Sequence, residues 1–159
     1  MPNALRREIK QGRPFASLEQ EAMLSVERTA AILAHRLADA FKAHGITATQ
    51  YNVLRILRGA GADGLSRTDI RCRLVAQVPD VTRLIDRLEE AHLVERDRDS
   101  ADRRVVTTRI TRKGLAMLDA LDGPVTDAHA QQLGHMTAAQ LRSLIDLLAL
   151  ARAAPPVSS

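Results

Sequence analysis

Aromatic side chains are scarce in this chain: they make up 2% of its 159 residues, and tryptophan is absent. A core without large rings has to be built from Leu, Ile, Val and Ala, which suits helices packed on helices better than an extended sheet. Apolar residues nevertheless make up 45% of the chain, an ordinary share for a globular protein, so disorder throughout is excluded. We therefore expect one compact, mainly α-helical domain.

Long hydrophobic runs are also missing. No segment is apolar enough to span a bilayer, and residues 1–20 carry basic side chains without the apolar stretch of a signal peptide. Cys72 is the only cysteine, so a disulfide within the chain is excluded and nothing points to an oxidising compartment. We expect a cytoplasmic protein with no membrane association.

Motifs typical of catalysis are not found. The sequence has no phosphate-binding glycine loop, no nucleophile elbow and no metal-ligand motif, so we expect no enzymatic activity, no cofactor and no metal. The histidines show no compact ligand spacing on one helix, and we interpret them as surface or packing residues. They are His35, His44, His92, His129 and His135.

Cys72 has two interpretations. The flanking Arg71 and Arg73 would favour a reactive thiolate, and oxidation would then disturb the neighbouring helices as a redox switch. The alternative is a passive cysteine with no redox role, and we favour it.

Basic residues exceed acidic ones only modestly, but the excess is concentrated. The formal net charge is +4, and arginine supplies nearly all of the basic residues. Residues 66–113 contain twelve Lys or Arg against nine Asp or Glu, so most of the excess lies there. Arginine binds phosphates and guanine edges in bidentate geometry, whereas a solvated, salt-bridged surface is the alternative that charge alone leaves open.

The N-terminal half predicts three helices. Ser17 precedes a long helical pattern, and Gly45 ends it as a left-handed C-terminal cap. Thr49 is the expected cap of a second helix, which stops at the glycine-rich turn of residues 59–64. Ser66 opens a third helix. Three helices thus precede the most informative segment.

A fourth helix follows, and its two faces differ. Pro79 fits its first position, where the missing N–H costs nothing, and Asp80 suits the positive end of the helix dipole. An apolar stripe with helical spacing is formed by Val81, Leu84, Ile85 and Leu88. The residues off this stripe are Thr82, Arg83, Asp86 and Arg87. One face therefore packs while another can bind.

The remaining sequence predicts a hairpin and two more helices. Strands are expected at residues 93–96 and 105–110, joined by a polar, arginine-rich tip at residues 97–104. Thr111 caps a fifth helix with a kink or break at Gly123-Pro124, and Thr137 caps a last one. The apolar stripe of the last helix consists of Leu141, Leu144, Ile145 and Leu148. We expect residues 153–159 to be disordered.

Helices followed by an arginine-tipped hairpin make a winged helix-turn-helix, which fits double-stranded DNA. We expect the fourth helix in the major groove and the wing in the adjacent minor groove. The candidate DNA-binding residues are Arg67, Gln77, Pro79, Asp80, Thr82, Arg83, Arg87, Arg98, Arg103 and Arg104, with Asp99 and Asp102 orienting the wing. The alternative to DNA binding for Arg83 and Arg87 is an ordinary ion pair with Asp80, Asp86 or Glu90 at helical spacing.

The sequence also resembles the MarR (multiple antibiotic resistance) regulators over about residues 17–152. The resemblance is carried by three stretches: Thr49-Gln-Tyr-Asn-Val-Leu-Arg-Ile-Leu57, Val81-Thr-Arg-Leu-Ile-Asp-Arg-Leu88, and the wing Arg96-Asp-Arg-Asp-Ser-Ala-Asp-Arg-Arg104 followed by Ile110-Thr-Arg-Lys-Gly114. The wing with its following Thr-x-x-Gly is the specific part.

This resemblance implies a triangular homodimer whose N- and C-terminal helices interlock. Such regulators usually repress their own or a neighbouring operon and release DNA when a small molecule, often phenolic, binds. We therefore expect an N-terminal arm at 1–16, a winged helix-turn-helix at 46–113, and dimerisation helices at 17–45 and 114–152. From the family layout, His35, Tyr51 and Arg55 are expected to line an effector cavity.

Dimerisation has independent support in the apolar stripes, which exceed what one small helix-turn-helix core would cover. A dimer with two-fold symmetry requires a pseudo-palindromic operator with half-sites about 10 bp, or a multiple of 10 bp, apart. Two other functions remain open: an architectural protein that coats DNA with little sequence preference, and a helix-turn-helix kept for docking proteins.

Overall fold

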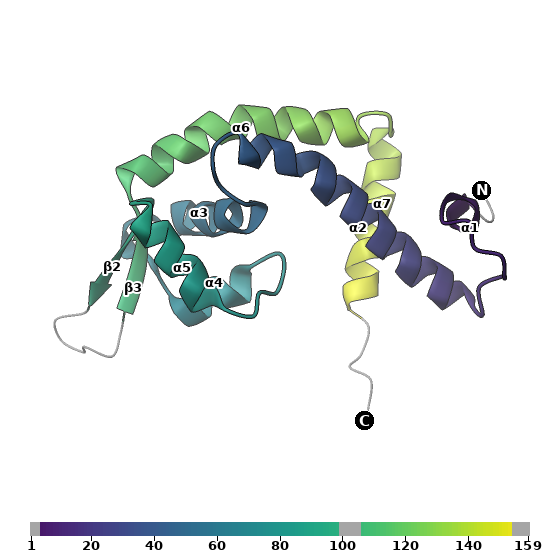
Figure 1. Cartoon of the computed structure of the whole chain (residues 1–159), viewed down its shortest axis with the longest axis horizontal. Coiled ribbons are helices and arrows are strands. Elements are labelled where there is room, and N and C mark those ends of the chain that lie inside the picture. Colours follow the sequence, from purple (N-terminus) through teal and green to yellow (C-terminus); the bar gives the residue numbers. More distant parts are fainter. Residues whose placement is uncertain (1–3, 99–105, 154–159) are drawn as a thin grey trace, which may run out of the picture.

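The computed structural model describes residues 4–98 and 106–153 (Figure 1). Most of this part is helical, and none of its helices is long and apolar enough to cross a membrane. The elements in chain order are α1 (Ala4–Glu8), α2 (Leu18–Lys42), α3 (Ala48–Ala60), η1 (Gly61–Asp63), β1 (Leu65–Ser66), α4 (Arg67–Arg73), α5 (Val81–Glu90), β2 (Val94–Arg98), β3 (Val106–Ile110), α6 (Arg112–Leu133) and α7 (Ala138–Arg152).

Two parts can be distinguished in Figure 1. Helices α3, α4 and α5 and the strands gather at one end, and we call this part, residues 48–110, the head. Helix α6 arches from the head across the molecule with α2 packed along it, while α7 lies at the opposite end. We call α2, α6 and α7 the arm. The sequence prediction of a mainly α-helical winged helix-turn-helix is confirmed.

Side-chain caps fix where the helices begin. The oxygen of each cap accepts the backbone N–H three residues ahead at 2.9–3.2 Å, which satisfies one of the free donors of the first turn. The predicted caps Ser17, Ser66, Thr111 and Thr137 are confirmed.

The predicted cap of α3 was wrong by two residues. Thr47, not Thr49, caps this helix: its hydroxyl accepts the N–H of Gln50, and the Gln50 side chain accepts the N–H of Thr47 at 2.9 Å. This reciprocal capping box satisfies two donors, whereas Thr49 would leave Gln50 without a role.

The predicted start of α5 at Pro79 was also wrong. Asp80 is the cap, because its carboxylate accepts the N–H of Arg83 at 2.9 Å, and α5 begins at Val81. A start at Pro79 would require Val78 as the cap, and its side chain has no oxygen to offer.

Helix α6 continues through Pro124, so no break occurs at Gly123-Pro124. Proline removes one backbone donor and crowds the preceding turn. The helix persists because Leu121 and Val125, on either side of the proline, are both buried in the core. Tertiary packing therefore outweighs the local cost.

The sheet has one strand more than predicted. Its order is β1-β3-β2, and both pairings are antiparallel, with Leu65 opposite Thr108 and Val94 opposite Ile110. β1 was missed because a strand of two residues carries no alternation to detect. It links the start of α4 to the wing strands, so the wing is part of the head.

A single hydrophobic core joins the head to the arm. Fully buried residues come from α3 (Leu54 and Leu57), α5 (Leu88) and α6 (Leu118 and Leu121). α6 therefore belongs to both parts. Its orientation relative to the head is set by close packing and not by a flexible linker.

Helices α2 and α5 end with the same hydrogen-bond pattern. In α5, the N–H of His92 bonds to the carbonyl of Glu89 at 2.8 Å and that of Leu93 to Leu88 at 2.9 Å, which is a Schellman motif. The motif needs a left-handed residue: Gly45 supplies it after α2 with φ 69°, but His92 has φ 59° after α5. A side chain with a Cβ is strained in that conformation.

Replacing His92 with glycine is therefore expected to stabilise the protein. The His92→Gly variant should raise the free energy of unfolding by about 1 kcal/mol, because glycine adopts left-handed backbone without strain. Urea unfolding monitored by circular dichroism measures this difference. His92→Ala, which also removes the imidazole but keeps a Cβ, should give no such gain; an equal gain from both variants would contradict the explanation.

Candidate nucleic-acid interface

Helix α5 presents one face to the core and another to solvent. Val81, Ile85 and Leu88 are buried and Leu84 is half-buried, as the apolar stripe predicted. Thr82, Arg83 and Arg87 are exposed. The exposed face thus offers a hydroxyl and two guanidinium groups.

Arg83 and Arg87 have no carboxylate partner within the described residues. Two of the acidic residues that could have paired with them have other roles. The Asp80 carboxylate caps the helix, and Asp86 binds Arg96. Within the described residues the two arginines therefore do not form the ion pairs of the alternative interpretation, and their side chains are exposed.

Arg96 attaches the wing to α5. It lies on β2, pairs with Asp86 and has its Nε 3.4 Å from an oxygen of Glu89. A second link lies within the wing, where Arg109 of β3 binds Asp97 at 2.8 Å and donates to the carbonyl of Ala62 at 2.7 Å. The strands of the wing are thus held to both α5 and η1.

The Thr-x-x-Gly motif closes the wing on the arm. The Thr111 hydroxyl donates to the carbonyl of His92 at 2.8 Å and accepts the N–H of Gly114 at 3.1 Å. A Cβ on Gly114 would clash with the carbonyl oxygen of Leu93. The motif therefore marks a close approach between α6 and the chain entering β2, which explains why both residue types are needed.

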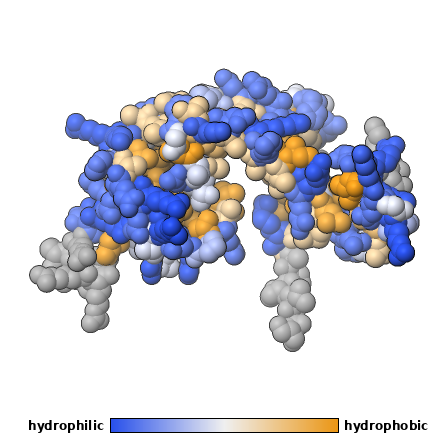
Figure 2. Space-filling view, viewed as in Figure 1, coloured by the Kyte–Doolittle hydropathy of each residue, from blue (hydrophilic) through white to orange (hydrophobic). Residues whose placement is uncertain are grey.

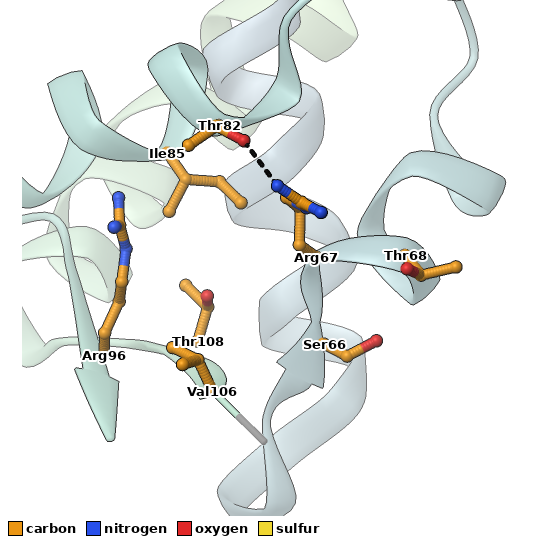
Figure 3. Close-up of a pocket in the computed structure, with 8 residues that line it drawn as sticks. All are labelled: Ser66, Arg67, Thr68, Thr82, Ile85, Arg96, Val106 and Thr108. Carbon is orange, nitrogen blue, oxygen red and sulfur yellow. Dashed lines mark hydrogen bonds between the residues drawn. The ribbon is translucent and has the colours of Figure 1, made fainter. Parts of the chain in front are cut away.

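Helix α4 contacts the first turn of α5 through side chains. Arg67 Nη1 donates to the Thr82 hydroxyl at 3.0 Å, beside a hollow of about 420 Å³ between α4, α5 and the wing (Figure 3). Arg96 and Thr108 lie on the opposite side of that hollow. Asn52 of α3 accepts the N–H of Val75 at 2.9 Å and so holds the loop between α4 and α5.

Most of the predicted DNA-binding residues lie on the exposed surface of the head. They are Arg67, Gln77, Pro79, Asp80, Thr82, Arg83 and Arg87. Arg98 is the last residue of β2, and Asp99, Asp102, Arg103 and Arg104 lie outside the described residues. Figure 2 shows hydrophilic residues over much of the visible face of the head, with apolar patches on both the head and the arm.

Arg58 links α3 to α6 at the junction of head and arm. Its guanidinium binds both carboxylate oxygens of Asp122, at 2.8 and 3.2 Å, and lies 3.8 Å from Asp119. The hydrogen bonds from Arg58 lower the pKa of Asp122, and the same bonds raise the pKa of Arg58. This forked pair supports the orientation that the shared core imposes on the head.

The residues expected to bind an effector come together only in part. Tyr51 is buried against Phe41, with ring centroids 4.9 Å apart, and the guanidinium of Arg55 lies 5.9 Å from the Tyr51 ring. His35 is exposed on α2 and makes no hydrogen bond with either within the described part of the chain. A separate apolar hollow of about 190 Å³ lies between α2 and α6. It is lined by Leu33, Ala34, Leu37, His129, Gln132 and Leu133.

Cys72 is exposed on α4, beside Arg71. In the residues that the structure describes, no group of three or more His, Cys, Asp or Glu side chains could hold a metal ion. Sequence reasoning missed Arg58, Arg96 and Arg109, whose partners lie on other elements. For Arg96 a signal existed, because Asp86 and Glu89 are three residues apart on one face of a helix.

Comparison with known proteins decides the family. Residues 46–106 match the MarR family. A MarR transcription factor from Planctomyces limnophilus has a solved structure with 42% identity and a TM-score of 0.67, covering 86% of this chain and 99% of that chain. The chain belongs to the MarR family.

Two other MarR-type proteins are also similar. The HTH-type transcriptional regulator YkoM of Bacillus subtilis, itself uncharacterized, is 34% identical over 55% of this chain, and the chain spans about half (54%) of YkoM. BpsR of Bordetella bronchiseptica, whose DNA binding is regulated by 6-hydroxynicotinic acid, has 24% identity and a TM-score of 0.77 over 90% of this chain and 100% of that chain. The likeness to BpsR concerns the fold.

The Asp122 pKa leads to a pH-dependent prediction. Because its folded pKa is depressed, the pair stabilises the MarR-family fold above the unfolded pKa and loses this effect as the pH falls through the folded value. Asp122→Asn should therefore lower the free energy of unfolding near pH 7 by at most about 1 kcal/mol, since its side chain is 45% exposed.

Chemical unfolding of the wild type and Asp122→Asn at pH 7 and at about pH 3 tests this, because the difference should shrink at the lower pH. Asp119→Asn is the matched control: its carboxylate is 3.8 Å from Arg58 and 76% exposed, so little change is expected. A difference that does not depend on pH would rule out the ion pair as its cause.

Proposed function

We propose that this protein is a sequence-specific DNA-binding transcriptional regulator that acts as a homodimer. The observation that carries the proposal is the exposed face of α5, where Arg83 and Arg87 have no carboxylate partner in the described structure and the wing lies alongside. Guanidinium groups without a protein partner are suited to phosphates and guanine edges. Membership of the MarR family supports the same function.

In the proposed complex, α5 enters the major groove and the wing reaches the adjacent minor groove. Arg83 and Arg87 would contact base edges, while Arg98, Arg103 and Arg104 of the wing would contact phosphates and the minor groove. Asp99 and Asp102 would orient those arginines. The ion pairs of Arg96 support this arrangement because they fix the wing relative to α5.

Dimerisation would be carried by the arm. α7 has no buried residue, and its Ile145, Leu147 and Leu150 are 63–71% exposed. Met23 and Val26 of α2 are exposed as well. Covering these side chains with a second copy would remove a large apolar area from water, which is favourable.

We also propose that the protein represses transcription until a small hydroxylated aromatic acid weakens its binding to DNA. The regulation of BpsR by 6-hydroxynicotinic acid supports this chemistry. Burial of Tyr51 beneath Arg55 supports an aromatic and cationic site near the head, as the sequence suggested for His35, Tyr51 and Arg55.

Selection of binding sites from random double-stranded DNA tests the function. The wild type should select a two-fold symmetric site and bind it at least about a thousandfold more tightly than random DNA at physiological salt. Salt-dependent binding without any selected motif would instead favour an architectural protein, and no binding would overturn the proposal. Repeating the titration with 6-hydroxynicotinic acid tests the effector.

Variants of the same assay assign roles to the arginines. Arg83→Ala and Arg87→Ala should weaken operator binding by about 1–3 kcal/mol each and relax the sequence preference. Arg103→Ala and Arg104→Ala should weaken binding to all sequences. Each should also reduce the slope of log affinity against log salt concentration by about one. Arg28→Ala on the arm removes the same charge and should have little effect; equal losses in all five variants would contradict these roles.

The dimer is tested by placing charges on α7. The double variant Ile145→Glu with Leu150→Glu should convert a dimer to a monomer in light scattering, because carboxylates cannot be buried without partners. Operator affinity should fall about a hundredfold or more, since the two heads would then bind independently. Val75→Glu is the control for the oligomeric state alone, because Val75 is 91% exposed but lies on the head. A double variant that remains dimeric would show that α7 is not the interface.

A further inference from the structure

The hydrogen bond between Arg67 and Thr82 restricts what the Thr82 hydroxyl can do. Figure 3 shows the two side chains pointing toward each other from α4 and α5, and Arg67 Nη1 lies 3.0 Å from the hydroxyl oxygen. A guanidinium has no acceptor, so Thr82 accepts this bond. One of the two lone pairs of the hydroxyl is thereby occupied by a charged donor, which polarises the O–H bond, so that the hydroxyl donates more strongly and its remaining lone pair accepts less readily.

The hydroxyl proton of Thr82 has no acceptor among the described residues. Other hydroxyls within helices use theirs locally: Ser25 donates to the carbonyl of Glu21, and Thr126 donates to that of Asp122, both at 2.7 Å. Thr82 is the second residue of α5, so the residue four positions earlier is Val78, outside the helix. Because Thr82 lies in the first turn of α5, its hydroxyl is exposed and has no carbonyl of a preceding helical turn to which it could donate.

We propose that the bond from Arg67 favours Thr82 as a hydrogen-bond donor, so that Thr82 recognises an acceptor on a base edge in the operator. The proposal deepens the function proposed above and rests on it. Arg67 is then a positioning residue for this contact, while its remaining N–H groups stay available to a phosphate.

The donors and acceptors on the base edges in the major groove determine which bases can accept a hydrogen bond from Thr82. Purine N7, guanine O6 and thymine O4 accept a hydrogen bond, whereas the amino groups of cytosine and adenine only donate. A hydroxyl without a charged neighbour would accept from an amino group as readily as it donates to an acceptor, whereas the guanidinium of Arg67 disfavours a second donor on the same oxygen. With Arg67 in place, Thr82 should discriminate against cytosine at the base that it faces.

The test measures base preference and not affinity alone. Competition binding with a library of operators, each with one base pair changed, is performed for the wild-type protein and four single variants. The variants are Thr82→Val, Thr82→Ser, Arg67→Met and Thr68→Val. Thr68→Val is the matched control, because Thr68 lies beside the same hollow but makes no hydrogen bond to Arg67. Thermal unfolding of each variant checks that the fold is retained.

Thr82→Val should lose about tenfold discrimination at one base pair of each half-site, the expected effect of one hydrogen bond to a base edge. Arg67→Met should lose discrimination at the same base pair although Thr82 is present. Thr82→Ser should keep the preference, and so should Thr68→Val whatever its affinity.

Three results would overturn the proposal: discrimination that survives in Thr82→Val, Arg67→Met with weaker binding but an unchanged base preference, or loss of preference at that base pair in Thr68→Val. Failure of the proposed function is distinguishable from all three, because the wild type would then show no preference at any base pair.

Discussion

Burial of one side of α5 determines what the rest of the head presents. Val81, Ile85 and Leu88 pack into the core that α3 and α6 complete, so the helix cannot rotate about its axis without exposing them. Thr82, Arg83 and Arg87 face outward as a result, and the ion pairs of Arg96 place the wing relative to the same helix. The surface proposed to bind DNA therefore consists of the residues that the core leaves exposed.

Much of the fold follows from local rules, and these succeed where one residue has one clear role. Ser17, Ser66, Thr111 and Thr137 could be identified as caps because each precedes an apolar periodic segment. The rules fail where two candidates compete, as at Thr47 and Thr49, because only the partner Gln50 decides between them. At Pro124 the local rule allowed a break that does not occur, since packing from both sides maintains α6.

The candidate site was predictable as a set of exposed side chains but not as a network. The helical period and the charge pattern identify Arg83 and Arg87, whose proposed role depends only on their exposure. Arg58, Arg96 and Arg109 act through partners on other helices or strands, and the distance along the chain between Arg58 and Asp122 gives no local sign of their bond. Arg67 and Thr82 were each expected to touch DNA, yet the bond between them emerges only from the packing of α4 on α5.

Helix α6 is continuous from the core of the head to the far end of the arm, and this continuity has an evolutionary consequence. An α-helix advances about 1.5 Å and turns about 100° with each residue. In the proposed dimer, inserting one residue into α6 beyond Pro124 would therefore rotate the head about the helix axis while moving it outward. Only insertions of three or four residues, about one turn, would return it to nearly the same orientation. Descendants of this protein would thus be expected to adapt to wider operators in helical steps and not by gradual adjustment.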